Sequence, residues 1–436
     1  MLKRRLLIIL CLLSTGAVLV SQAQDDQPLT QPTIDAAVGT LLAQTAQAPT
    51  QIAATQTIQA ALEAALTATA QPSATTLSTP EVIDVSSLQV TGTTDIDLLA
   101  GPARQAAYLA PSGEVFAHLG EAVCLYAGDA EQSCVELPEE LRSLDSESVR
   151  WSPDSRYLTF HENFFQLLMD PDIWVWDTQT GELRDITNDK QDRLSLSNDT
   201  WKNIDVLPDW LPDGRILFLR YNRINGEHQP PDIYTIQPDG SELTKLGTIQ
   251  TSDPVSIYGL STVEERLVYN DAPAGDSDYR GIWVSNLDGS DAQQIVAIDR
   301  ETLQVSGVEA SADGRYALLF TPPTDFRRRQ PEDSLVKILD IENRQILLVD
   351  PDQFVVGAAW SPDGSALAYL VNDRESSDDN GLYITGTPGE AGRLLLEGDY
   401  NTPNLGRWQS LTWGANNTIL LSRSPSGGIV LVQLGS

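Results

Sequence analysis

Short apolar runs alternate with polar turns along most of this chain, and one pattern of about ten residues appears seven times. Each copy has an apolar first residue, a turn of the Ser-Pro-Asp-Gly kind and about five mostly apolar residues. In Ser361-Pro362-Asp363-Gly364, serine suits the first position of a type I turn, proline presets φ at the second and glycine suits the fourth. Two antiparallel strands joined by a tight turn are therefore predicted at each copy. The copies begin at Ala110, Trp151, Trp210, Leu260, Ala310, Trp360 and Trp413.

A second apolar run follows each copy, and in most copies a turn rich in Gly or Asp then leads to a further strand. Each unit therefore contains four strands, here called a, b, c and d in chain order. The spacing of about 40 to 60 residues between copies is typical of the blades of a β-propeller. We predict an all-β, seven-bladed β-propeller; six blades plus an irregular unit is the alternative. The c runs are Val123–Tyr126, Ile173–Trp176, Ile233–Ile236, Ile282–Val284, Val336–Leu339, Leu382–Ile384 and Ile429–Val432.

The last copy reaches Ser436 directly after its strand c, and strand-like residues stand before the first copy, at Val82–Val85 and Asp95–Leu99. We expect this N-terminal segment to supply strand d of the last blade. Closure of the ring in this way removes strand edges that would otherwise invite aggregation.

The segments WSPDGSALAY at Trp360–Tyr369, IWV at Ile282–Val284 and DGS at Asp288–Ser290 resemble the repeat of TolB-like periplasmic proteins. The same repeat recurs in the propeller domains of prolyl-oligopeptidase-type enzymes. The resemblance covers residues 95–436 and implies a propeller, an architecture that hosts many unrelated tasks. TolB has an α/β domain before its propeller for which this chain has no room, so the resemblance does not extend to TolB's partners.

The first 80 residues have the composition of a targeting segment followed by a linker. Residues 1–23 combine Lys3, Arg4 and Arg5 with an apolar stretch, Leu6–Val20, and small residues near Ala23, which predicts a cleaved signal peptide. Its apolar stretch is short for a spanning helix, so contact with a membrane is expected only if it stays uncleaved. Residues 24–80 are rich in Ala, Thr, Gln, Pro and Ser, which predicts a disordered linker. The propeller is assigned to residues 81–436, as a monomer.

Charge and cysteine content fit an exported protein that is periplasmic, at the cell surface or extracellular. The chain has 61 acidic and 28 basic residues, a net charge of −33, which argues against nucleic acid as a partner. Cys124 and Cys134 fall in strands c and d of the first unit, on either side of a turn near Asp129. Antiparallel pairing about that turn predicts a disulfide, which an oxidising compartment permits. Two free buried thiols are the alternative.

No catalytic motif stands out, since the sequence has no G-x-S-x-G, H-E-x-x-H or phosphate-binding glycine loop. His118 is interpreted as a hydrogen-bonded structural residue, whereas His161 and His228 are placed in b–c loops. We expect no cofactor or metal; calcium at residues 372–381 or 288–291 is the alternative, because oxygen ligands are dense there. The aspartates of the repeated turn are explained by hydrogen bonds to the backbone.

The connections from b to c and from d to a are the long ones, and they emerge at one rim of a propeller. Binding residues are commonly mounted on such loops. Exposed aromatics and a basic cluster converge on these connections, which are 161–172, 188–209, 221–232 and 321–334 together with the connection around Trp408. The predicted binding residues are Phe164, Phe165, Trp201, Arg223, His228, Phe326, Arg327, Arg328, Arg329 and Trp408.

We therefore expect an exported, non-catalytic propeller that binds a protein, a peptide or a cell-envelope glycan through its long-loop rim. The alternative is an extracytoplasmic polysaccharide lyase or hydrolase with its site in the central funnel. That alternative requires ionisable groups such as His161, His228 and Arg327–Arg329 to converge in one cavity.

Overall fold

The computed structural model divides the chain into two units, residues 1–79 and 80–436. It describes parts of the second unit only: residues 83–97, 106–120, 122–138, 141, 144–162, 171–188, 201–251, 256–272, 280–299, 303–321, 330–372, 379–400, 411–422 and 428–436. The predicted signal peptide and the whole of the predicted linker lie outside these residues. No helix in the described ranges is long and apolar enough to cross a membrane.

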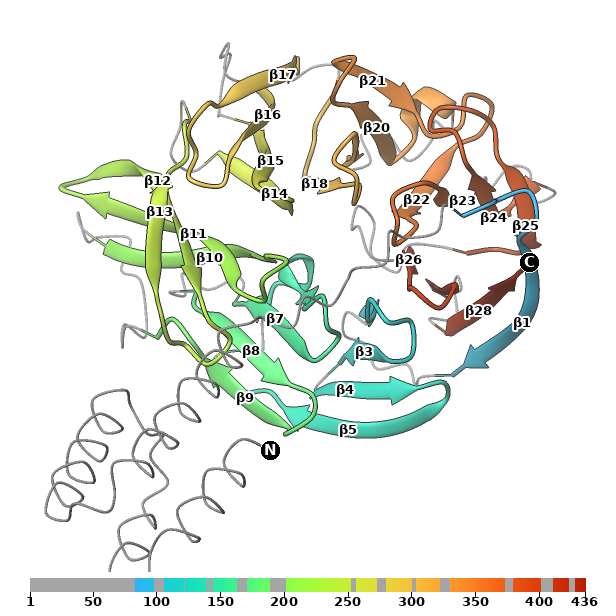
Figure 1. Ribbon diagram of the computed structural model, residues 1–436, viewed down its shortest axis with the longest axis horizontal. Helices are drawn as coiled ribbons and strands as arrows, with labels where there is room; N and C mark the ends of the chain where they lie inside the picture. The colour runs from blue at the N-terminus through green and yellow to red at the C-terminus, as the bar shows by residue number, and fades with distance from the viewer. Residues whose placement is uncertain are drawn as a thin grey trace, which may run out of the picture. The chain divides into compact units, whose positions relative to one another are not determined.

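Seven four-stranded antiparallel sheets are arranged in a ring, so the predicted seven-bladed propeller is confirmed (Figure 1). Strand a of each blade lies nearest the axis of the ring and strand d forms its outer edge. Blade 1 contains β2 (Ala106–Leu109), β3 (Phe116–Leu119), β4 (Ala122–Ala127) and β5 (Ala130–Glu136); blade 2 contains β6 (Arg150–Trp151), β7 (Tyr157–His161), β8 (Ile173–Asp177) and β9 (Glu182–Asp185); blade 3 contains β10 (Trp201–Trp210), β11 (Ile216–Ile224), β12 (Glu227–Ile236) and β13 (Thr244–Thr248).

The remaining blades repeat the same order of strands, and each predicted c run forms the third strand of its blade. Two short 3-10 helices, η3 (Ser146–Ser148) and η4 (Pro331–Asp333), lie in connections. Blade 4 contains β14 (Ile257–Val263), β15 (Arg266–Asp271), β16 (Gly281–Asn286) and β17 (Gln293–Ala297); blade 5 contains β18 (Gly307–Ala310), β19 (Tyr316–Phe320), β20 (Val336–Asp340) and β21 (Gln345–Leu348); blade 6 contains β22 (Val355–Trp360), β23 (Leu367–Val371), β24 (Gly381–Thr385) and β25 (Arg393–Glu397); blade 7 contains β26 (Leu411–Trp413), β27 (Thr418–Ser422) and β28 (Ile429–Gly435).

The N-terminal segment closes the ring, as predicted. β1 (Gln89–Ile96) pairs antiparallel with β28 from Gln89↔Gly435 to Ile96↔Ile429, and Figure 1 shows the blue strand beside the red one. The predicted bounds were wrong, because the strand covers neither Val82–Val85 nor Asp95–Leu99 as a whole. The polar run Gln89–Asp95 forms it instead, since an outermost strand has little to bury and the apolar signal is weak there.

Tryptophans at the first position of the repeat pack between blades. Trp151 and Trp210 donate their indole N–H groups to Tyr108 O and Arg150 O, over 2.9 and 3.2 Å, and so join each blade to the one before it. The Trp210 ring also stacks on Tyr157 of the previous blade, with 6.0 Å between centroids. In the turns, Asp154, Asp213, Asp313 and Asp363 each accept a hydrogen bond from a backbone N–H two residues later, which confirms their structural role.

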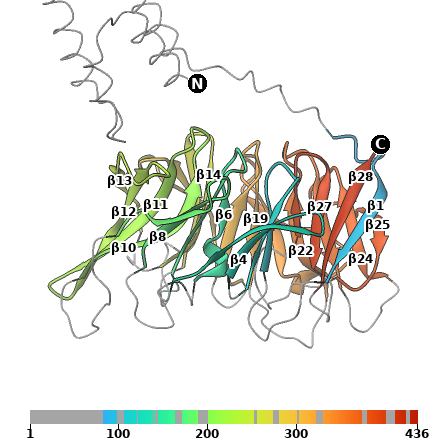
Figure 2. The ribbon, with the colours of Figure 1, turned by 90° about the horizontal axis from the view of Figure 1, so that it is seen from below.

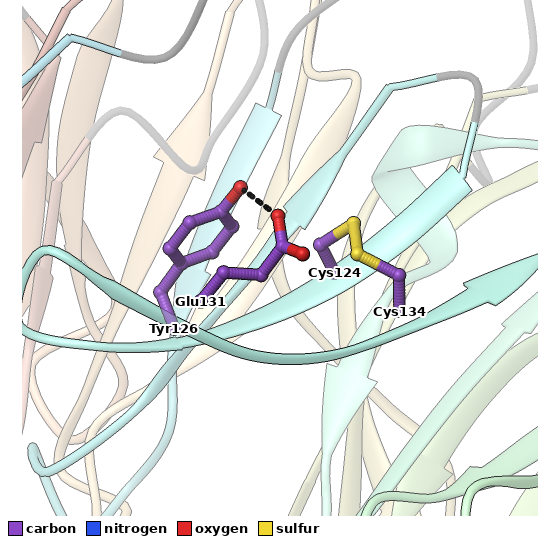
Figure 3. Close-up of a disulfide and its surroundings, with 4 residues drawn as sticks. All are labelled: Cys124, Tyr126, Glu131 and Cys134. Carbon is purple, nitrogen blue, oxygen red and sulfur yellow. Dashed lines mark hydrogen bonds between the residues drawn. A yellow bond between two sulfur atoms is a disulfide. The ribbon is translucent and has the colours of Figure 1, made fainter.

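Cys124 and Cys134 form the predicted disulfide between β4 and β5 (Figure 3). The two residues are directly opposite in the strand register, and their Cα atoms are 4.0 Å apart. The bridge thus fastens the outer edge of blade 1.

Candidate functional site

The two rims of the propeller differ in the length of their connections. The a–b and c–d turns form one rim, and the b–c and d–a connections form the other (Figure 2). In blade 3 the predicted b–c loop is absent, because β11 and β12 continue as a hairpin with only Asn225 and Gly226 between them. The expectation of a loop over residues 221–232 was therefore wrong. The hairpin extends outward beyond the blade on the long-loop side (Figure 2).

Local sequence explains the hairpin tip. Asn225 and Gly226 have φ angles of 53° and 83°, and positive φ at both central residues is the requirement of a type I′ turn. Arg223 donates from Nε to Gly226 O over 3.1 Å, which fastens the tip. The Asn-Gly dipeptide is the strongest short-range hairpin signal, and it was the clue that could have predicted this element.

The edge of the hairpin is protected from further pairing. Residues 227–231 of β12 extend past the ladder that β13 forms with residues 232–235. Pro230 and Pro231 stand on this stretch and have no N–H groups to donate. The two prolines therefore disfavour the addition of a further strand along this stretch.

Three of the predicted binding residues can be placed. Trp201 begins β10, opposite Arg223 on β11, and Arg223 is in turn opposite His228 on β12. The backbone thus brings these three positions into one row across the extended sheet, and the exposed Ile224 belongs to the next row, opposite Glu227. Trp201 was expected in a d–a loop but belongs to a strand, because β10 is longer than a repeat-based boundary allows. The other predicted binding residues lie outside the described ranges: Phe164, Phe165, Phe326, Arg327, Arg328, Arg329 and Trp408.

An acidic cluster is buried at the base of the hairpin, between blades 2 and 3. Glu162 Oε2 accepts a hydrogen bond from Asp172 N over 2.6 Å, and Glu162 Oε1 accepts one from Trp174 Nε1 over 2.7 Å. Asp205 binds Arg220 through two contacts of 2.6 Å each. The other two acids of the cluster, Glu162 and Asp172, are almost inaccessible to solvent. Sequence reasoning missed the cluster because its residues come from four strands or connections.

The proton affinity of this cluster is unusual. Burial raises the pKa of Glu162 to about 7. Burial, together with the negative charges of Asp185, Glu162 and Asp205, raises the pKa of Asp172 to about 9. Desolvation and like charges both favour the neutral acid, so Asp172 is protonated at neutral pH. Its Oδ1 atom still accepts a hydrogen bond from Thr187 Oγ1 over 3.1 Å.

The three histidines lie on three strands: His118 on β3, His161 on β7 and His228 on β12. His161 is the last residue of β7 and is buried, with its Nδ1 atom 2.7 Å from Glu162 O. Its assignment to a loop was wrong. His118 is half-buried on β3, and its Nε2 atom has no hydrogen-bond partner in the described part of the protein, so its interpretation as a fully hydrogen-bonded residue was wrong as well.

A second group of charges lies on innermost strands. Glu309 on β18 keeps an exposed surface, yet strands around the axis enclose it, and this desolvation raises its pKa to about 7. The positive charge of Arg150 opposes that rise and the negative charge of Asp209 adds to it. Asp209 itself is held by Thr262, whose backbone N–H donates to Asp209 Oδ2 over 2.6 Å.

A small cavity of about 180 Å³ lies on the opposite rim, between blades 2 and 3. Arg156, Tyr157, Asp177, Glu182 and Arg184 are among its lining residues. Arg156 pairs with Asp177 at 2.7 Å and Arg184 pairs with Glu182, so neither cation is available to an anionic ligand without breaking an ion pair.

The acidic segments considered for calcium have local explanations or cannot be placed. Asp288 accepts a hydrogen bond from Ser290 N over 2.9 Å, as turn residues do. Most of residues 372–381 lies outside the described ranges.

The comparisons with known proteins support the fold. No protein-family model matches the chain, and no curated protein matches it. Among solved structures, the chain is similar to oligogalacturonate lyase from Vibrio parahaemolyticus, with 13% identity, a TM-score of 0.50, and coverage of 79% of this chain and 97% of the lyase. It also matches TolB from Acinetobacter baumannii, with 13% identity, a TM-score of 0.35, and coverage of 76% of this chain and 64% of TolB. At such identities, likeness indicates architecture and not activity.

Proposed function

We propose that this propeller is an exported, non-catalytic binding module that recognises a protein, a peptide or a cell-envelope glycan through its long-loop rim. The observation that carries the proposal is the β11–β12 hairpin, which extends beyond blade 3 on that side (Figure 2). A projecting hairpin contributes little to the core of a propeller, whereas it gives a rigid mount for binding side chains.

The chemistry of the hairpin tip fits such a role. Ile224 keeps 41% of its surface exposed, and exposed large apolar residues are few among those described. Arg223 and His228 are opposite each other in the register and share the other face of the hairpin, in a chain with a net charge of −33. Arginine is enriched at binding hot spots. The acidic remainder of the molecule repels nucleic acid and other polyanions.

Blade 3 offers a matched test of the rim. Leu243 precedes β13 in the c–d turn on the opposite rim and is 45% exposed, close to the 41% of Ile224. The full chain would be immobilised and used to capture species from an envelope extract of the producing cells. We expect Ile224→Asp with Arg223→Glu to reduce capture of the dominant species about tenfold, which corresponds to about 1.4 kcal/mol. Leu243→Asp should leave capture unchanged; the reverse pattern would place the binding surface on the other rim.

A second variant tests the basic cluster predicted from the sequence. Arg327, Arg328 and Arg329, each changed to Glu, would reverse a charge of three in one connection. We expect this variant to lose capture as well if the cluster belongs to the same surface. Unchanged capture would remove these arginines from the proposed site.

An enzymatic function in the central funnel is the second candidate. Glu309, with a pKa raised to about 7, has the proton affinity of a general acid or base near neutral pH. A polysaccharide lyase is one reading, since the similar Vibrio structure is a lyase of oligogalacturonate. Incubation with oligogalacturonate decides between the two: unsaturated products that vanish in Glu309→Gln would favour the enzyme, and their absence supports the binding module.

A further inference from the structure

The face of blade 1 that carries the disulfide also carries a carboxylate, so that three groups able to bind a metal lie close together there. Glu131 lies on β5 with the exposed Cys134, and one of its carboxylate oxygens lies within 4.8 Å of both sulfur atoms. Figure 3 shows the carboxylate beside the sulfur–sulfur bond. Tyr126 donates its hydroxyl to Glu131 Oε2 over 3.0 Å, which orients the carboxylate. Two sulfurs and an oriented carboxylate are a donor set that zinc prefers once the sulfurs are thiolates.

The strand register keeps the two cysteines together without their bond. β4 and β5 are paired from Ala122↔Glu136 to Ala127↔Ala130, with Cys124 opposite Cys134. A Zn–S bond of about 2.3 Å and a tetrahedral angle place two thiolates about 3.8 Å apart. Side chains directly opposite in an antiparallel pair are about 5 Å apart at Cβ, so rotation about χ1 can bring the sulfurs to that separation.

We propose that reduced Cys124 and Cys134, together with Glu131, bind Zn²⁺, so that the disulfide and the zinc site are alternative states of one location. A dithiol reductant attacks the exposed Cys134 sulfur and forms a mixed disulfide, and its second thiol then releases the protein. In sum, two electrons and two protons pass to the cysteine pair, and the dithiol becomes a disulfide. Zn²⁺ displaces the two thiol protons, and water completes the tetrahedron.

His118 provides an internal comparison. It stands opposite Cys124 on β3, in the same cross-strand row, but it is not part of the three-donor group. Burial lowers the pKa of its imidazole. Because we assign the fourth position to water, His118→Gln should leave zinc affinity within about threefold of the parent, whereas the loss of a protein ligand costs tenfold or more.

Zinc affinity in the two redox states tests the proposal. The full chain with Cys11→Ser would be reduced by a phosphine, separated from it without oxygen and titrated with Zn²⁺ against a coloured chelator. We expect one equivalent to bind the reduced protein and none to bind the oxidised protein. Co²⁺ in place of Zn²⁺ should give a thiolate-to-metal charge-transfer band, which reports on sulfur ligation directly.

Two carboxamide variants separate ligation from surface charge. Glu131→Gln should weaken zinc binding about tenfold or more, whereas Glu136→Gln, at another exposed position of β5, should not change it. Both changes lie on the surface, and circular dichroism would verify that the fold is kept. Binding to the oxidised protein, the absence of stoichiometric zinc in the reduced protein, or equal affinity in Glu131→Gln would overturn the proposal.

Discussion

Replacing Asp172 by Asn should stabilise the protein at neutral pH and stabilise it further at alkaline pH. Asp172 has an ordinary pKa of 3.8 when unfolded and about 9 when folded. The folded state therefore holds a proton that the unfolded state has released, and the free energy of unfolding falls as pH rises from 3.8 towards 9. Glu162 adds to this loss between pH 4.5, its ordinary pKa, and about pH 7, its pKa in the folded protein.

The size of the effect follows from proton linkage. One group changes stability by at most about 1.4 kcal/mol per pH unit. Between pH 7 and pH 9 Asp172 alone therefore accounts for a loss of at most about 3 kcal/mol. Asparagine mimics the neutral acid and keeps a carbonyl oxygen that can accept the hydrogen bond from Thr187 Oγ1. The variant should lose this pH dependence.

Urea unfolding followed by tryptophan fluorescence at pH 6, 7, 8 and 9 would measure the effect. Asp129→Asn, which makes the same chemical change in an exposed turn of blade 1, is the control without burial. Either of two results would refute the assignment of a buried neutral Asp172. One is a wild-type urea midpoint that does not decrease as the pH is raised from 7 to 9, and the other is an equal gain in stability in both variants.

Three further predictions concern stability and are measured by urea unfolding at pH 7. Ile96→Ala should lower the free energy of unfolding by about 2 to 5 kcal/mol, because this residue of β1 is 5% exposed in a cluster with Phe116 and Leu420. Thr94→Ala, at an exposed position of β1, is its control. Equal losses in the two variants would contradict closure of the ring through β1. Replacing both Cys124 and Cys134 by Ala should cost about 3 kcal/mol, since the bridge closes a loop with a sequence separation of 10; no loss under oxidising conditions would argue against the bridge. Trp151→Phe should lower the free energy of unfolding by about 1 kcal/mol more than Trp413→Phe does. The reason is that Trp151 Nε1 donates a hydrogen bond to Tyr108 O, whereas the buried Trp413 Nε1 has no partner in the described residues. A larger loss in Trp413→Phe would contradict the role of the Trp151 indole N–H between blades.

The fold was accessible from the sequence because a repeat states the same structural requirement many times. The turn Ser361–Gly364 and the run Ile282–Val284 each predict a local strand or turn, and recurrence turns local predictions into an architecture. The closing strand was located only approximately, since Gln89–Asp95 is mostly exposed and lacks apolar alternation.

The candidate site was less accessible, for two physical reasons. The hairpin tip was hidden because length alone was taken to mean a loop, although Asn225-Gly226 carries a turn preference that favours continued pairing. The acidic cluster was hidden because Glu162, Asp172 and Asp205 come together only when blades 2 and 3 are adjacent. No local pattern records such a contact, and burial, which gives these groups their raised pKa values, is a property of the assembled ring.

Deviation from the repeat is informative only when the fold does not explain it. On innermost strands, Asp209 and Ser261 depart from the apolar pattern, but each accepts a hydrogen bond from a backbone N–H of the following blade, Thr262 N and Ala310 N respectively. These side chains thus join neighbouring blades, and their polarity needs no ligand. The β11–β12 extension has no counterpart in the described strands of the other blades, and its tip carries the exposed Ile224. By this criterion the hairpin, rather than the polar residues around the axis, is the stronger basis for a binding function.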